Sequence, residues 1–287
     1  FGQGLANMGY SFGKPMIVRT AAGWRVLVTS GYDNGTSTGG NGQGYVWVLD
    51  PADGSILATI GTGAGSDANP SGLAHLSSMA NLPPDALTQY VYGGDLLGNV
   101  WRFDLDTNTA QKIAVATDPS GVSQPITSPP EVGPVPGSST KQFVYVGTGR
   151  YFSEQDVPGS ALATAAATQQ QSLYGFIDDT TQVSPVVPDV RGTNGAACPT
   201  SGGDGELVCQ SLTYNTTTLK YSASTRAVDL ASKRGWYLDW PADDRLRNGR
   251  VIGKPSLTRR GTLALTVNMP KEETCLPGGT SWAFALN

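Results

Sequence analysis

The clearest β-hairpin pattern in this chain is Tyr90-Val91-Tyr92-Gly93-Gly94-Asp95-Leu96-Leu97-Gly98-Asn99-Val100-Trp101-Arg102-Phe103-Asp104-Leu105. It begins with a β-branched and aromatic run at residues 90–92 and continues with a polar, glycine-containing turn cluster at residues 95–99. Residues 100–105 then alternate Val and Arg with Trp and Phe, which is the period of a β-strand. The run therefore predicts two paired strands and the turn that joins them.

The same pattern returns along the chain, and each copy ends in an aromatic strand. The further copies are 26–31 with 44–50, 143–149 with 172–178, and 263–267 with 281–286. Repeated hairpins of this kind predict an all-β fold, and specifically a β-propeller whose blades are small antiparallel sheets. The candidate blade units are residues 1–60, 89–116, 142–180 and 235–287.

The aromatic strands are unevenly spaced, so the blades must be separated by insertions of different lengths. Residues 117–141 and 181–230 are rich in small and polar residues and carry little strand pattern. Binding on a rigid scaffold is usually carried by such loops. We therefore expect ligand contacts within residues 152–234, although the sequence singles out no individual ligand-binding residue. The aromatic strand residues, including the tryptophans, are expected to pack the core.

Composition narrows the functional class. The 287 residues include 37 Gly and 19 Pro, only 15% are charged, and the net charge is −4. No cluster of Lys and Arg is present, which argues against nucleic-acid binding, because phosphate contacts need a basic stripe. No apolar run approaches the roughly 20 residues of a membrane-spanning helix, and no signal peptide is visible. We expect an exported protein, seen here as a mature or trimmed fragment.

The three cysteines favour an oxidising compartment. Cys198 and Cys209 flank the glycine-rich, polar segment 199–208, and we predict a disulfide between them. Their spacing fits no zinc pattern, and the only histidine, His75, is far away in the sequence. Cys275 is left over, either free or paired with a segment outside this chain.

Several short strings, in this order, carry a family resemblance. They are Gly9-Tyr10-Ser11-Phe12-Gly13-Lys14-Pro15, Gly31-Tyr32-Asp33-Asn34, the hairpin at 92–105, Gln124-Pro125-Ile126-Thr127, Gly147-Thr148-Gly149-Arg150-Tyr151-Phe152 followed by Asp156, Gly235-Trp236-Tyr237-Leu238, and Cys275-Leu276-Pro277-Gly278-Gly279-Thr280-Ser281-Trp282. Together they resemble the C-terminal β-propeller of the PilC/PilY-type family, the type IV pilus tip-associated adhesins. The combination extends over nearly the whole chain.

The resemblance implies an extracellular protein at the pilus tip or on the bacterial surface. Its expected role is to aid pilus assembly and adhesion, with minor pilins, the pilus tip and a host-cell or surface receptor as partners. The resemblance also implies that residues 1–287 are the later blades of a larger, irregular, quinoprotein-like propeller with long inter-strand insertions. No transmembrane segment and no nucleic-acid partner are expected.

Family members often carry an acidic calcium loop just before the hairpin at 92–105. Here the corresponding segment, residues 77–89, has the single carboxylate Asp85, whereas calcium prefers six to eight oxygen ligands. Asp104-Leu105-Asp106-Thr107-Asn108 opens like a calcium loop but continues with Thr109 where glycine is expected, so it is interpreted as a hairpin turn. Asp33-Asn34-Gly35 is interpreted as a flexible connection. We therefore predict no metal site and no cofactor.

Catalytic interpretations find little support in the sequence. His75 lies in no nucleophile motif, and the adjacent acids Asp243-Asp244 and Glu272-Glu273 would point to opposite faces of an extended strand. Residues 46–54 also resemble repeats of quinone-dependent dehydrogenases, but the catalytic Asp and polar cofactor ligands of that class are not found. A sugar-binding lectin propeller is the other alternative, with the tryptophans as its platform. The preferred hypothesis is a non-catalytic adhesion and pilus-biogenesis module that binds through its loops.

Overall fold

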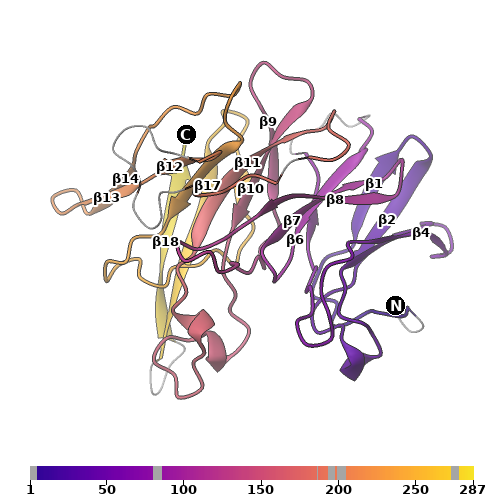
Figure 1. Ribbon diagram of the computed structural model, residues 1–287, viewed down its shortest axis with the longest axis horizontal. Helices are drawn as coiled ribbons and strands as arrows, with labels where there is room; N and C mark the ends of the chain where they lie inside the picture. Colours follow the sequence, from indigo (N-terminus) through magenta and orange to yellow (C-terminus); the bar gives the residue numbers. More distant parts are fainter. Residues whose placement is uncertain (1–4, 80–85, 186, 193–197, 199–204, 273–277) are drawn as a thin grey trace.

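The computed structural model describes residues 5–79, 86–185, 187–192, 198, 205–272 and 278–287. In these residues the chain forms β-strands and short 3₁₀ turns, and no helix is long and apolar enough to cross a membrane. The strands follow one another as four principal sheets. The first sheet (indigo) and the last (yellow) lie on opposite sides of the molecule, with the other two between them (Figure 1).

The first two sheets are four-stranded and antiparallel, with their strands in chain order. The first contains β1 (Met16–Thr20), β2 (Gly23–Thr29), β3 (Tyr45–Leu49) and β4 (Ile56–Gly61). The second contains β5 (Leu76–Ser77), β6 (Tyr90–Gly94), β7 (Asn99–Asp104) and β8 (Thr109–Val115). The predicted hairpin at residues 90–105 is therefore β6 and β7, paired from Tyr90 with Asp104 to Gly94 with Val100.

The third and fourth sheets are less regular. The third is ordered β9 (Glu131–Pro134), β10 (Lys141–Gly147), β11 (Ser172–Asp179), β15 (Gly235–Asp239) and β12 (Val208–Gln210). Its last strand, β12, runs parallel to β15. The fourth contains β16 (Ser256–Leu257), β17 (Leu263–Lys271) and β18 (Gly278–Leu286). The 3₁₀ turns are η1 (Thr36–Thr38), η2 (Glu154–Asp156) and η3 (Ala165–Ala167).

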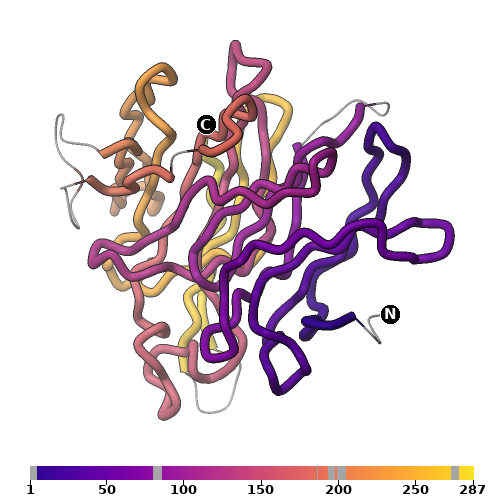
Figure 2. Tube along the Cα trace, turned by 45° about the vertical axis from the view of Figure 1, so that its right-hand side comes forward, coloured from indigo at the N-terminus to yellow at the C-terminus, as the bar shows by residue number. Residues whose placement is uncertain are grey.

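Residues 180–234, called the third-sheet insertion below, lie between β11 and β15 in sequence. The two strands nevertheless pair directly, from Ser172 with Asp239 to Phe176 with Gly235. The candidate unit 235–287 is thus divided between two sheets. Besides β12, the insertion forms a separate hairpin, β13 (Leu212–Asn215) with β14 (Lys220–Ala223), at the periphery of the molecule in both views (Figure 2).

The apolar core lies between neighbouring sheets. One cluster joins the first and second sheets through residues such as Leu27, Val46 and Phe103. A second joins the second and third sheets, and a third joins the third and fourth sheets. Face-to-face contact between successive small sheets is the packing expected of propeller blades, because each sheet buries apolar side chains on both faces.

Asp95 explains the turn chemistry of the β6–β7 hairpin. Its buried carboxylate accepts hydrogen bonds from Trp101 Nε1 at 2.9 Å and Asn99 Nδ2 at 2.9 Å. It also accepts from the backbone N–H groups of Leu97 and Asn99 and from Ser71 Oγ. Burial raises the pKa of Asp95, and the hydrogen bonds from Trp101 and Asn99 oppose that rise. The motif is therefore a structural device that fixes this turn.

The first strands of the sheets lie beside one another. Met79, just after β5, forms a parallel bridge with Val132 of β9. Glu131 of β9 accepts a hydrogen bond from the backbone N–H of Leu257 in β16 at 3.0 Å, and it pairs with Lys254 at 3.3 Å. Lys14 and Met16, at the start of β1, line a cavity of about 310 Å³ together with residues of β5 and with Glu131. The connections that lead into these strands are thereby brought together.

Candidate functional site

A concave surface of about 740 Å³ lies where those connections meet. Aromatic side chains dominate its described lining: Tyr10, Phe12, Tyr32, Tyr151 and Phe152. We call this surface the aromatic basin. Most of these rings are far from buried, with Phe12 70% and Tyr10 57% exposed. Because exposed large apolar side chains that gather in one place mark binding surfaces more often than scattered ones do, the basin is the principal candidate site.

The basin collects segments that are distant in sequence. Residues 10–12 precede β1, Thr127 precedes β9, and residues 151–152 follow β10. Four of the strings that carry the family resemblance each contribute to the lining: 9–15, 31–34, 124–127 and 147–152. The resemblance is therefore concentrated in space, although its strings are spread along the chain.

Four of the five rings form a continuous row across the basin. The centroids of Tyr10 and Phe12 are 6.5 Å apart, those of Phe12 and Tyr32 are 5.9 Å apart, and those of Tyr32 and Phe152 are 4.6 Å apart. Tyr32 is the anchor of the row, since it is only 9% exposed and donates a 3.5 Å hydrogen bond to the carbonyl oxygen of Thr127. Burial raises the pKa of Tyr32 to about 12, so its hydroxyl stays neutral at physiological pH.

The described lining of the basin carries little charge. Asp33 is exposed and adopts a left-handed backbone conformation, with φ at 51°. His75 is partly buried, and burial lowers its pKa, as does the positive charge of Lys14. The imidazole is therefore neutral at pH 7. Asp33 is left as the one formal charge among the described lining residues, which include no Lys or Arg.

Buried polar groups hold the Tyr151–Phe152 rim in place. Asp156 accepts a hydrogen bond from Arg150 Nε at 2.6 Å and another from the backbone N–H of Phe152 at 2.9 Å. Arg250, only 2% exposed, donates to the carbonyl oxygens of Arg150 and Asp156 at 2.8 and 2.7 Å. Burial lowers the pKa of Arg250 to about 10. The rim is therefore pre-organised.

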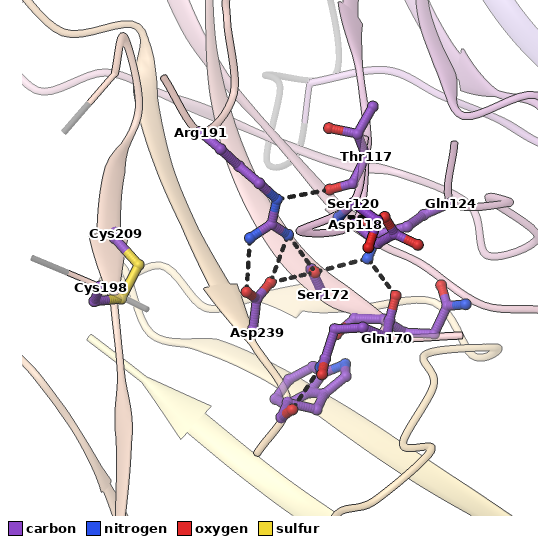
Figure 3. Close-up of polar contacts among 12 residues, drawn as sticks. Thr117, Asp118, Ser120, Gln124, Gln170, Ser172, Arg191, Cys198, Cys209 and Asp239 are labelled. Carbon is purple, nitrogen blue, oxygen red and sulfur yellow. Dashed lines mark hydrogen bonds and ion pairs between the residues drawn. A yellow bond between two sulfur atoms is a disulfide. The ribbon is translucent and has the colours of Figure 1, made fainter. Parts of the chain in front are cut away.

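A second polar network fastens the third-sheet insertion (Figure 3). Arg191 donates from its two terminal nitrogens to the two carboxylate oxygens of Asp239 at 2.7 and 2.8 Å, and its Nε donates to the carbonyl oxygen of Thr117 at 2.9 Å. Ser172 Oγ donates to Asp239 at 2.6 Å and accepts from Gln124 Nε2 at 2.8 Å. We call these five residues the arginine latch.

The predicted cysteine pair lies close to the latch. Cys198 and Cys209 form a disulfide with their Cα atoms 5.4 Å apart, and Cys209 belongs to β12. A cavity of about 660 Å³ is lined by Cys198, Asp239 and other residues of this region. The insertion is therefore tied to the third sheet by a paired strand, the latch and a disulfide, although its sequence shows little pattern.

The other sequence-derived candidates fall into structural roles or outside the described residues. Asp104 accepts hydrogen bonds from the backbone N–H groups of Asp106 and Thr107, as a turn residue does. His75 lies in the basin. Asp85, Glu273 and Cys275 lie outside the described residues. Within the described ranges, no three His, Cys, Asp or Glu residues are grouped as a metal site would require.

Comparison with known proteins shows what this chain is similar to. Residues 3–112 match the family model described as the PilY1 β-propeller domain. A type IV pilus biogenesis factor PilY1 homologue of Xylella fastidiosa is 29% identical over 98% of this chain. Type IV pilus biogenesis factor PilY1 of Pseudomonas aeruginosa is 25% identical, again over 98% of the chain. The predicted resemblance to the PilY1-type family is confirmed.

The PilY1-type fold is supported by a solved structure as well. The crystal structure of the Pseudomonas aeruginosa PilY1 C-terminal domain matches with a TM-score of 0.70 at 22% identity, covering 99% of this chain and 60% of that one. The predicted all-β propeller is thus confirmed. The chain spans only 19% of the Xylella fastidiosa relative and 25% of the Pseudomonas aeruginosa relative.

Sequence reasoning did not find the aromatic basin of this PilY1-type propeller. We expected binding within residues 152–234, yet only Phe152 among the described lining residues falls in that range. A usable signal was present, because Tyr10, Phe12, Tyr32, Tyr151 and Phe152 all stand next to glycine-rich connections and do not alternate within strands.

Proposed function

We propose that this chain is a non-catalytic module of a type IV pilus biogenesis factor, acting outside the cell at the pilus tip or on the bacterial surface. The supporting observation is its similarity, over 98% of the chain, to proteins of Xylella fastidiosa and Pseudomonas aeruginosa that carry this name. Four of the seven strings behind the resemblance contribute residues to the aromatic basin, so part of the similarity is gathered at one surface.

In this proposal the module works by binding, and the aromatic basin is its contact surface. Exposed Tyr and Phe side chains contribute large contact areas with few rotatable bonds, and protein interfaces are enriched in aromatic residues for this reason. The Asp156–Arg250 scaffold holds one rim in position before any partner arrives, which reduces the entropy lost on binding. The partners would be minor pilins or other pilus-tip components, with a host-cell or surface receptor for adhesion.

The absence of catalysis is part of the proposal. A hydrolytic site needs a nucleophile activated by a nearby base. In the basin the hydroxyl of Thr127 is already engaged, donating to the carbonyl oxygen of Gly149 at 2.8 Å. Apart from the tyrosine hydroxyls, the titratable groups among the described lining residues are Asp33 and a neutral His75. These are the groups that could act as an acid or a base in a reaction.

The proposal also includes no resident cofactor and no calcium bound by residues 77–89, where Asp85 is the only carboxylate. Calorimetric titration of the purified protein with calcium should reveal no micromolar site in this segment. A tight site that disappears in Asp85→Ala would contradict this part of the proposal. The remainder would be unaffected.

A pilus assay tests the binding role. The full-length parent protein carrying Phe12→Ala with Tyr151→Ala would replace the wild type in its own bacterium, and surface pili would be quantified after shearing. We expect at least a severalfold loss of surface pili and of adhesion. A matched control changes two exposed apolar residues that do not line the basin, Trp24→Ala with Val122→Ala. Equal pilus levels in both variants would overturn the proposal.

A further inference from the structure

The carboxylate of Asp33 lies at the aromatic basin, and no partner for it is found in the described part of the chain. Within the described residues its side chain makes no hydrogen bond or ion pair, whereas its backbone oxygen accepts a 2.8 Å hydrogen bond from Thr38 Oγ1. The backbone conformation, with φ at 51°, is one that few residues other than Gly, Asn and Asp adopt easily. The loop thus holds the backbone of a negatively charged residue at the basin.

In the described residues, the basin rings lack the cations that lie over four aromatic rings elsewhere in the protein. Elsewhere, Arg191 lies 4.7 Å from the centroid of Tyr237 and Arg245 lies 4.0 Å from that of Tyr214. Arg102 and Lys112 make similar contacts. Within the described residues, no such cation stands over a basin ring. The nearby cation Arg150 is engaged by Asp156, and Lys14 lines the neighbouring cavity.

The negative faces of aromatic rings and an adjacent carboxylate together favour a positively charged group. We infer that the aromatic basin binds an arginine or lysine side chain presented by a segment of a partner protein. Its volume of about 740 Å³ exceeds what one side chain fills, so neighbouring residues of the partner would contact Tyr10 and Phe12, the most exposed rings. The inference rests on the proposed role of the basin as the contact surface and names the chemistry it selects.

Short peptides test the inference without any pilus component. The probes are acetyl-Gly-Arg-Gly-amide and the same peptide with citrulline, which keeps the shape of arginine but is neutral. Binding to the purified chain would be followed by NMR titration. We expect millimolar affinity for the arginine peptide and at least tenfold weaker binding of the citrulline peptide. Asp33→Asn, which suits the same backbone conformation, and Phe12→Ala should each weaken arginine binding by roughly two- to fivefold.

Matched controls show whether a loss of binding comes from the basin residues themselves or from removing any surface charge or any exposed ring. Asp53→Asn removes another exposed carboxylate at a turn, and Trp24→Ala removes an exposed ring outside the basin; neither should change binding. Equal affinity for arginine and citrulline, no measurable arginine binding, or tighter binding of a neutral oligosaccharide would each overturn the inference. If that happens while the Phe12→Ala, Tyr151→Ala strain still loses pili, the proposed function stands and only the cation chemistry fails.

Discussion

Aromatic residues occupy two contrasting regions of this molecule. In the β6–β7 hairpin, Tyr92, Trp101 and Phe103 are at most 4% exposed and pack between sheets. In the aromatic basin, Phe12 is 70% and Tyr151 is 44% exposed. The composition of the two regions is similar, but the first group belongs to paired strands and the second to connections. Between these two regions, the aromatic residues of the paired strands are buried, whereas Phe12 and Tyr151 in the connections are exposed.

The polar atoms of the two regions also differ in their hydrogen-bond partners, because one region is buried and the other is exposed to water. Tyr92 and Arg102, buried between the second and third sheets, both bond to the buried carboxylate of Asp178, at 2.7 and 2.8 Å. Buried polar groups need such partners because water cannot reach them. The exposed tyrosines of the basin can be satisfied by water, so they remain available to a ligand. Replacing residues in each region should show this difference directly.

The largest effect is expected from Trp101→Ala. The change removes a large core side chain and one of the hydrogen bonds to Asp95, so the free energy of unfolding should fall by about 3–5 kcal/mol. Urea denaturation would measure it, with the exposed Trp24→Ala as a control that changes stability by less than about 0.5 kcal/mol. A stable Trp101→Ala protein that has lost only ligand binding would favour the lectin alternative.

A smaller effect is expected from removing the Cys198–Cys209 disulfide. In the chain-entropy model a loop of this size is worth at most about 3 kcal/mol. Because Arg191 and β12 still hold the insertion, the double Cys→Ser variant should make the chain around position 198 easier to cleave and leave arginine-peptide binding unchanged. Limited proteolysis would detect this change. Mass spectrometry of a non-reduced digest checks the bond itself, and two free thiols there would contradict it.

Phe12→Ala should leave stability nearly unchanged and weaken binding, whereas Trp101→Ala should mainly lower stability. Its ring is mostly exposed, so the free energy of unfolding should change by less than about 0.5 kcal/mol. Peptide binding and pilus assembly should nevertheless decline. Thermal denaturation measures the change in stability, and the peptide titration measures the change in binding. A large loss of stability would mean that the basin rings are part of the core after all.

The smallest expected effect is the contribution of His75 to the pH dependence of stability. His75 is partly buried, so it is less exposed than Phe12 and more exposed than Tyr92. Burial and Lys14 lower the pKa of His75 in the folded protein, so the unfolded chain binds this proton more readily. Its contribution to stability is therefore present above about pH 6.5 and is lost as pH falls through the folded pKa. Urea midpoints at pH 7.5 and 5.5 should differ less in His75→Asn than in the wild type. An identical difference in both proteins would contradict the assignment.

The hairpin patterns were sufficient to predict the fold class, because turn residues and strand alternation are local signals. The β6–β7 pairing lies within the predicted run. The pairing of β15 with β11 and the parallel strand β12 could not be predicted, since partners far apart in sequence are selected by packing and carry no local signature. The basin escaped prediction for the same reason: Tyr10, Tyr32 and Phe152 become neighbours only when the first strands assemble.

The direct pairing of β11 with β15 has a consequence for how such a chain can vary. The third-sheet insertion leaves β11 after Asp179, adds β12 at the edge of the same sheet, and rejoins at Gly235, beside the strand it left. The pairing of β11 with β15 therefore holds the two ends of the insertion close together. The entropy of closing a flexible loop grows only with the logarithm of its length, so doubling it costs about 0.6 kcal/mol. The parts of this segment outside Arg191 and β12 could thus be lengthened or shortened with little penalty to the blade that carries it.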